Sequence, residues 1–133
     1  MIKLLIGSKG SGKTKTLIEL TNTAADNSKG SVVCIEKGEK LKHEITYKAR
    51  LINSEDFNIT DSEALYGFVA GILASNNDIT DIFVDGSLKI CGGDVNGLAN
   101  TVKKLEPLLT DVNLVMSASI PVDECPEGIK AYA

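Results

Sequence analysis

Mainly apolar runs alternate along the chain with segments whose apolar residues recur at helical spacing. Four runs, at residues 2–6, 31–35, 80–85 and 112–117, have the length and composition of buried strands. A shorter run at residues 50–53 is expected to form an edge strand. Because continuous apolar runs are typical of strands covered on both faces, the pattern predicts a mostly parallel sheet of five strands.

Helical spacing predicts three helices between these strands. The first spans about residues 13–26. The second begins after Asp61, an expected N-cap. Its apolar positions recur at i, i+3, i+4, i+7 and i+8: Leu65, Phe68, Val69, Ile72 and Leu73. The third runs from about residue 95 to 109, with Asp94 as its cap and Pro107 bending it or ending it early.

The alternation of strands and helices predicts an α/β fold, a three-layer αβα sandwich in a single domain of residues 1–133. Two segments do not fit the alternation. Residues 37–48 are charged with few apolar anchors, which indicates a loose helix or an exposed loop. Residues after the last strand show no clear period.

A glycine-rich motif connects the first strand to the first helix. Residues Gly7-Ser8-Lys9-Gly10-Ser11-Gly12-Lys13-Thr14 match the phosphate-binding P-loop pattern, or Walker A motif, at every specified position. Its three glycines allow a tight turn and a close approach of backbone N–H groups to phosphate. The sequence therefore predicts that these eight residues bind a nucleoside triphosphate.

The last two positions of this motif suggest separate roles. Lys13 places an ammonium group near the β- and γ-phosphates, and the Thr14 hydroxyl suits a Mg²⁺ ligand. A second Mg²⁺ ligand is expected at Asp85, since Ile82-Phe83-Val84-Asp85 has the apolar-run-plus-acid form of a Walker B strand. The alternative for Asp85 is a turn residue, because Asp85-Gly86 is also a turn signal.

In the order of these features the chain resembles the core of RecA-like P-loop ATPases. The similarity covers most of the chain and rests on the P-loop and on residues 33–36, 51–53, the helix from Asp61, 81–87 and 114–119. It implies the sheet order 3-2-4-1-5. It also implies a catalytic carboxylate at the end of the second strand, which is Glu36 with Glu39 as its rival, and a polar sensor at Ser117 or Ser119.

The resemblance favours a slow Mg²⁺-dependent ATPase or nucleotide switch that acts with a protein partner or as a homo-oligomer. The alternatives are a nucleotide-binding accessory protein with little hydrolysis and a small-molecule or nucleoside kinase. Kinases usually hold the transferring phosphate with several arginines, and this chain has only Arg50. The cation missing from the site is therefore expected from a neighbour, while Lys37, Lys40 and Lys42 form a solvated face. ATP and GTP are both compatible with the motif.

Composition narrows the partners and the compartment. Of the 133 residues 43% are hydrophobic, and the net charge is −4 with no basic run longer than two residues, so nucleic acid is not a favoured partner. No apolar stretch has membrane-spanning length, and no cleaved signal is expected because residue 2 already enters the first strand. Three widely spaced cysteines indicate reduced thiols, and we expect a cytoplasmic protein.

Overall fold

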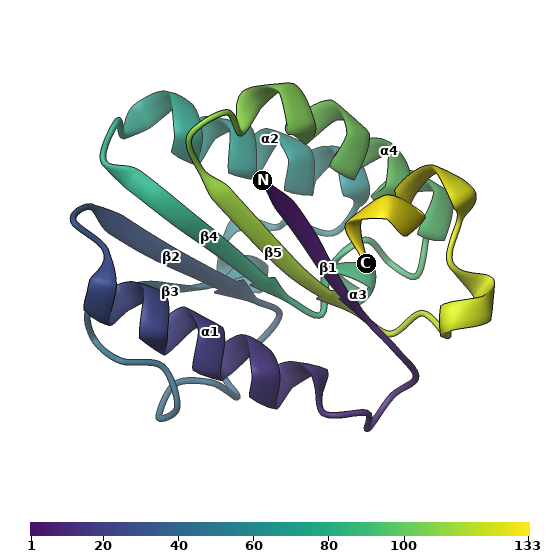
Figure 1. Ribbon diagram of the computed structural model, residues 1–133, viewed down its shortest axis with the longest axis horizontal. Helices are drawn as coiled ribbons and strands as arrows, with labels where there is room; N and C mark the ends of the chain where they lie inside the picture. Colours follow the sequence, from purple (N-terminus) through teal and green to yellow (C-terminus); the bar gives the residue numbers. More distant parts are fainter.

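The computed structural model describes residues 1–133 as a sheet between two helical layers (Figure 1). The five strands are all parallel, in the order β1-β5-β4-β2-β3. Their bounds are β1 (Ile2–Ile6), β2 (Ser31–Glu36), β3 (Ala49–Asn53), β4 (Ile79–Asp85) and β5 (Asn113–Ala118). The predicted α/β class and five-stranded parallel sheet are confirmed.

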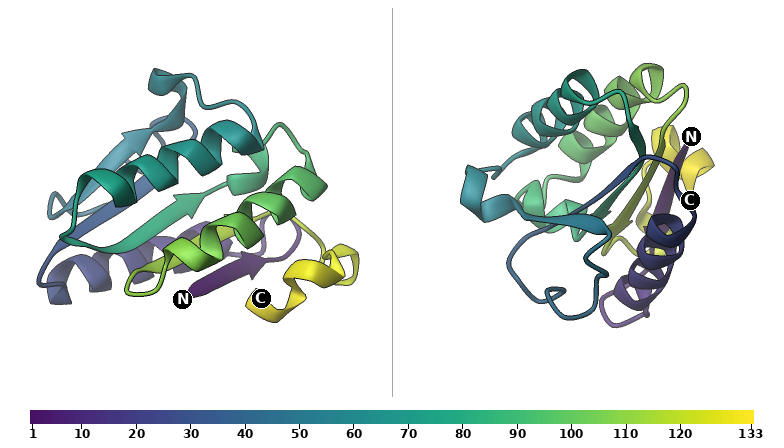
Figure 2. Two further views of the ribbon diagram at one scale, coloured as in Figure 1. Left: turned by 90° about the horizontal axis from the view of Figure 1, so that it is seen from above. Right: turned by 90° about the vertical axis from the view of Figure 1, so that its left-hand side faces the viewer.

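The helices cover both faces of the sheet, as the two views of Figure 2 show. Helix α1 (Lys13–Asn27) lies on one face, and α2 (Ser62–Ser75) and α4 (Val95–Leu105) pack together on the other. The short helix α3 (Ser87–Ile90) follows β4. Four 3-10 turns complete the chain: η1 (Ser54–Phe57), η2 (Glu106–Leu108), η3 (Val122–Glu124) and η4 (Glu127–Tyr132). None of these helices combines the length and the apolar character needed to cross a membrane.

The predicted starts of α2 and α4 are confirmed by N-cap hydrogen bonds. The Asp61 carboxylate accepts a hydrogen bond from the Ala64 N–H at 2.8 Å, and Asp94 accepts one from the Gly97 N–H at 2.9 Å. Such caps satisfy N–H groups that have no partner within a helix. Helix α4 ends at Leu105, and Pro107 lies in the 3-10 turn that follows.

The sheet separates two apolar cores of different size. The larger, of 23 buried residues, lies mainly between the sheet and helices α2 and α4, whereas seven buried residues form the core beneath α1. Cys34 belongs to the smaller core, where burial raises the pKa of its thiol to about 12. A thiol buried in apolar surroundings reacts poorly, so we expect Cys34 to be unreactive.

The position of β1 corrects the sequence analysis. The implied order 3-2-4-1-5 would place β1 inside the sheet, but the observed order places β5 there and β1 at the edge. Burial explains the exchange. All residues of β5 except the first are buried, whereas β1 alternates at its start, with Lys3 exposed between the buried Ile2 and Leu4. A charged side chain within a strand is easily accommodated at a sheet edge.

The sequence pattern did not predict the secondary structure of two other segments. Residues 37–48 form an irregular loop with no helix, which decides between the two expectations for them. The residues after β5 form the two 3-10 turns η3 and η4, and the buried Ile129 and Cys125 join them to the larger core.

Candidate functional site

The P-loop leaves the carboxyl end of β1 and becomes the first turn of α1. Gly12 is the N-cap of this helix with φ 88°, a left-handed conformation that L residues with a side chain rarely adopt. At Gly7, which has φ 151°, a Cβ would lie 2.7 Å from the Ser11 hydroxyl oxygen, so a side chain there would displace that hydroxyl. The helix start carries no side-chain cap, which leaves its N–H groups available to an anion.

Lys13 is folded back over this loop. Its Nζ donates to the Ser8 carbonyl oxygen at 2.9 Å and to the Ser11 hydroxyl at 3.3 Å. The ammonium group thus lies within the turn formed by the predicted phosphate-binding residues. A lysine in this position can neutralise phosphate oxygens without moving a secondary-structure element.

The carboxylate of Asp85, at the end of β4, meets the first helical turn of the P-loop. Its Oδ1 accepts a hydrogen bond from the Thr14 hydroxyl at 3.1 Å, although the two residues are 71 positions apart. The same oxygen accepts from the Ser117 hydroxyl at 2.8 Å, and Ser117 accepts from the Gly86 N–H at 2.8 Å. The structure therefore brings together Thr14, Asp85 and one of the two predicted sensor serines.

Glu36 lies beside this cluster. In the sheet register Glu36 of β2 is opposite Asp85 on one side and Asn53 on the other. Its carboxylate is buried and accepts from the Lys40 N–H at 3.1 Å and the Leu41 N–H at 2.9 Å. Burial raises the pKa of Glu36, and the Asp85 charge adds to this, while the two N–H bonds act in the opposite direction.

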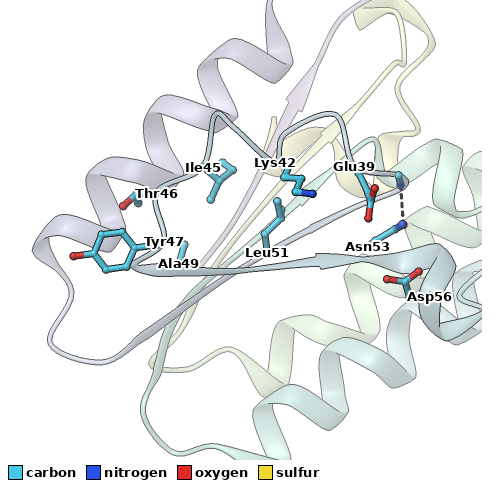
Figure 3. A pocket seen from close by; sticks show the side chains of 10 residues that line it. Glu39, Lys42, Ile45, Thr46, Tyr47, Ala49, Leu51, Asn53 and Asp56 are labelled. Carbon is cyan, nitrogen blue, oxygen red and sulfur yellow. Dashed lines mark hydrogen bonds between the residues drawn. The ribbon is translucent and has the colours of Figure 1, made fainter.

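Glu39 is near enough to Glu36 for its charge to raise the pKa of Glu36, but it lies outside the sheet. It lines a cavity of about 380 Å³ between segment 37–48 and β3, into which Lys42, Asn53 and Asp56 also face (Figure 3). Asn53 closes one end, since its Oδ1 accepts from the Gly38 N–H at 2.8 Å. The sequence could not separate Glu36 from Glu39, but the structure places only Glu36 beside Asp85 in the sheet.

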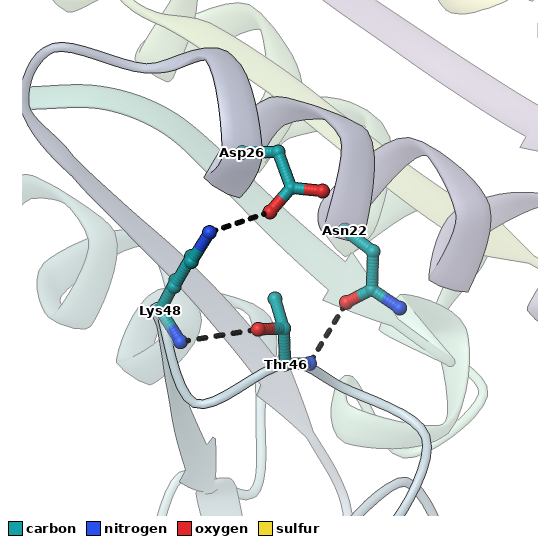
Figure 4. A network of polar contacts seen from close by, with 4 residues as sticks. All are labelled: Asn22, Asp26, Thr46 and Lys48. Atoms are coloured by element: carbon teal, nitrogen blue, oxygen red, sulfur yellow. Dashed lines mark hydrogen bonds and ion pairs between the residues drawn. The ribbon is translucent and has the colours of Figure 1, made fainter.

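Segment 37–48 is held in place by side chains from distant elements. Asn22 of α1 donates to the Glu44 carbonyl oxygen and accepts from the Thr46 N–H, both at 2.9 Å. Close by, the Lys48 ammonium group lies 3.1 Å from an Asp26 oxygen (Figure 4). These contacts, with those of Glu36, fix a loop that has no regular secondary structure.

The residues at the P-loop fit a Mg²⁺ ion that is shared with a ligand. No group of three or more His, Cys, Asp or Glu side chains forms a metal cage anywhere in the structure. Mg²⁺ in nucleotide sites is usually held by one or two protein oxygens, with phosphates and water completing the shell. The hydroxyl of Thr14 and the carboxylate of Asp85, in mutual contact, supply that kind of donor set.

Sequence reasoning missed Lys89 of α3. Its aliphatic stem lies over Gly86, with its Cδ 3.8 Å from where a Gly86 Cβ would be. No motif includes Lys89, and the four-residue helix that positions it is too short to give a periodic signal. Only the Asp85-Gly86 turn signal pointed to this part of the chain.

Comparisons with known proteins place the fold among solved structures. No family model matches the chain, and no curated protein sequence does so either. The flagellar accessory protein FlaH from Methanocaldococcus jannaschii superposes with a TM-score of 0.59 at 13% identity, over 98% of this chain and 65% of that chain. Domain III of the Thermotoga maritima replication initiation protein DnaA gives 0.49 at 16% identity, over 98% and 50%. The chain thus spans less than two thirds of these proteins, and the likeness to FlaH is one of fold.

Proposed function

We propose that the chain binds a nucleoside triphosphate with Mg²⁺ at the P-loop and acts as a slow ATPase or nucleotide-dependent switch. The observation behind this proposal is the contact between Thr14 and Asp85. It joins the end of the P-loop to the end of β4, where parallel α/β folds bind their ligands. ATP is the proposed nucleotide, with GTP as the alternative.

The residues of the P-loop would hold the nucleotide. The N–H groups from Gly7 to Thr14 would bind the phosphates, Lys13 would neutralise the terminal ones, and Thr14 and Asp85 would hold Mg²⁺. When bound, Mg²⁺ supplies neutralisation of charge on the phosphate oxygens. Ser117 would orient Asp85 through the hydrogen bond that it donates.

Glu36 is the carboxylate that we propose for orienting water, in preference to Glu39. It lies opposite Asp85 in the sheet, and burial raises its pKa, which makes its carboxylate a stronger proton acceptor than an exposed glutamate. Each of its oxygens already accepts one N–H bond and retains a second lone pair for water. A partner or a second copy of the chain would accelerate hydrolysis by supplying further cationic charge.

The test is nucleotide affinity with and without Mg²⁺, measured by calorimetry. Lys13→Ala removes a charge-assisted contact of about 1.5–3 kcal/mol and should weaken ATP binding roughly ten- to a hundred-fold. Lys15→Ala, which removes an exposed lysine one residue beyond the P-loop, is the matched control. Equal ATP affinity in Lys13→Ala and wild type would refute the assignment.

The second half of the site is tested separately. Asp85→Asn should weaken the Mg²⁺-dependent part of ATP binding and leave the unfolding temperature of the nucleotide-free protein nearly unchanged. A large loss of that stability with normal Mg²⁺-dependent binding would make Asp85 a turn residue instead.

A further inference from the structure

A second cavity opens at the carboxyl edge of the sheet, on residues that the P-loop does not use. It has a volume of about 400 Å³ and is lined by two lysines, three glycines, one serine and one apolar residue. Lys37 follows the end of β2, Lys89 lies in α3, and Ser119 follows β5. No acidic side chain lines the cavity, so the only charged groups that face it are positive.

The two lysines are free to meet a ligand. The ion pairs of the chain involve Lys48 and Lys130, so neither Lys37 nor Lys89 is paired with a carboxylate. Both residues are exposed, yet the stem of Lys89 is directed across Gly86 by contact. Two lysines that line one small cavity and have no carboxylate partner attract an anion more strongly than scattered surface lysines do.

The cavity borders the candidate nucleotide site. Gly86 in its wall directly follows Asp85, and Ser119 directly precedes Ile120, whose carbonyl oxygen accepts the Gly7 N–H at 2.9 Å. An anion bound here would therefore contact residues that are adjacent in sequence to the proposed Mg²⁺ ligand Asp85 and to Ile120, the hydrogen-bond partner of Gly7. A Mg²⁺ ion on Asp85 would remove the repulsion between that carboxylate and the anion.

We propose that this cavity is a second anion subsite, which binds a phosphate group other than those held by the P-loop. Two sources fit this chemistry: the inorganic phosphate that hydrolysis releases, and a small phosphorylated co-ligand that binds beside the nucleotide. The existence of the subsite stands on the cavity and its lysines, and only its relation to the nucleotide rests on the proposed function.

Backbone amide resonances give each site its own reporter in a titration with inorganic phosphate at physiological ionic strength. Shifts at Gly92 and Gly93 report the lysine-lined cavity, and shifts at Gly10 report the P-loop. We expect saturable shifts at Gly92 and Gly93 in wild type. The double variant Lys37→Ala/Lys89→Ala should weaken this binding at least tenfold and leave the response at Gly10 unchanged.

Lys40→Ala is the matched control, because it removes an exposed lysine of the same segment that does not line the cavity. Equal weakening in Lys40→Ala and in the double variant would overturn the proposal, since it would show general charge attraction. So would the absence of saturable shifts at Gly92 and Gly93. Loss of ATP affinity in the double variant with unchanged phosphate binding would also overturn it, by assigning both lysines to the nucleotide.

A second titration distinguishes the sources. Inorganic phosphate that binds the cavity more tightly with saturating Mg²⁺–ADP supports the product phosphate. Tighter binding of glycerol 3-phosphate than of inorganic phosphate supports a phosphorylated co-ligand. The proposed function can be refuted while this inference stands. If ATP causes no shift at Gly10 in wild type but phosphate binds at Gly92 and Gly93, only the second subsite is supported.

Discussion

The two loops that border the candidate site are held in opposite ways. The P-loop is shaped mainly from within, by a left-handed Gly12 and by bonds from Lys13 to its own Ser8 and Ser11. Its bonds to other elements lie at its two ends, from Gly7 to Ile120 and from Thr14 to Asp85. Segment 37–48 has turn bonds of its own, but the side chains that anchor it belong to α1, β2 and β3. The first loop therefore depends on local backbone chemistry, whereas the second depends on the fold being complete. Substitutions should separate these two kinds of dependence.

Leu41→Ala should have the largest effect on stability. Leu41 is 4% exposed and is the buried side chain that joins segment 37–48 to the smaller core, where the partly buried Ile45 also packs. Truncating a buried leucine costs about 2–5 kcal/mol, because a cavity remains where its methyl groups were. Denaturant unfolding measures the loss, and Leu108→Ala, at 44% exposure, should lose far less. Equal losses in both variants would mean that Leu41 does not anchor the segment.

Gly12→Ala tests the P-loop in the same assay. A Cβ at Gly12 meets no atom within 4 Å, so the cost comes from the left-handed backbone alone and should be about 1–2 kcal/mol. Gly67→Ala is the control, since Gly67 lies in the interior of α2 with open space around it. That variant should gain about 0.5–1 kcal/mol. A stabilised Gly12→Ala would show that the loop does not need its left-handed turn.

Asn22→Ala removes the attachment of segment 37–48 to α1. One exposed and one partly buried hydrogen bond are lost, and we expect a cost of about 1 kcal/mol. Asn100→Ala replaces an exposed helical asparagine that has no such contacts, and so corrects for the higher helix propensity of alanine. If both variants have the same free energy of unfolding, the bonds from Asn22 do not stabilise the segment.

The smallest effect is a pH dependence at Glu36. Because burial raises its pKa in the folded state, the folded protein binds this proton more tightly than the unfolded chain does. The contribution of Glu36 to stability should therefore fall as the pH rises from about 4.5 through the raised pKa. Wild type should lose stability relative to Glu36→Gln over this range, measured as unfolding temperature. Glu44→Gln controls for the loss of one charge, and an opposite trend at Glu36 would contradict the assignment.

The same contrast explains what the sequence could predict. Strands, helix caps and the P-loop follow from residues close together in the chain, so their positions agree with the expectations. Asp85 was predicted from a short Walker B pattern, which is informative only because a P-loop precedes it in the chain. The sequence could not decide whether Glu36 or Glu39 is the candidate catalytic carboxylate. The N–H groups that bind the Glu36 carboxylate come from a loop whose sequence has no periodic signal.

Strand order could not be predicted in this way. Both β1 and β5 are short and mainly apolar. Their positions in the strand order depend on which of them has a neighbouring strand on each side. Lys3 was the available signal, but one exposed residue in a five-residue strand is outweighed by the apolar remainder. Lys89 and Ser119 line the same cavity because a four-residue helix and the end of β5 meet there. No residue spacing along the chain predicts that meeting.

The edge position of β1 has a consequence for how the molecule opens. Hydrogen bonds attach β1 to the sheet through β5 alone, whereas β4 has a neighbour on each side. Local opening begins where backbone bonds are fewest, so β1, like β3 at the other edge, should detach at a lower free energy than the central strands. The proposed nucleotide would bridge this strand's P-loop to Asp85 in the middle of the sheet. Ligand release and the detachment of β1 would then be thermodynamically linked, and an occupied site would stabilise this edge of the sheet.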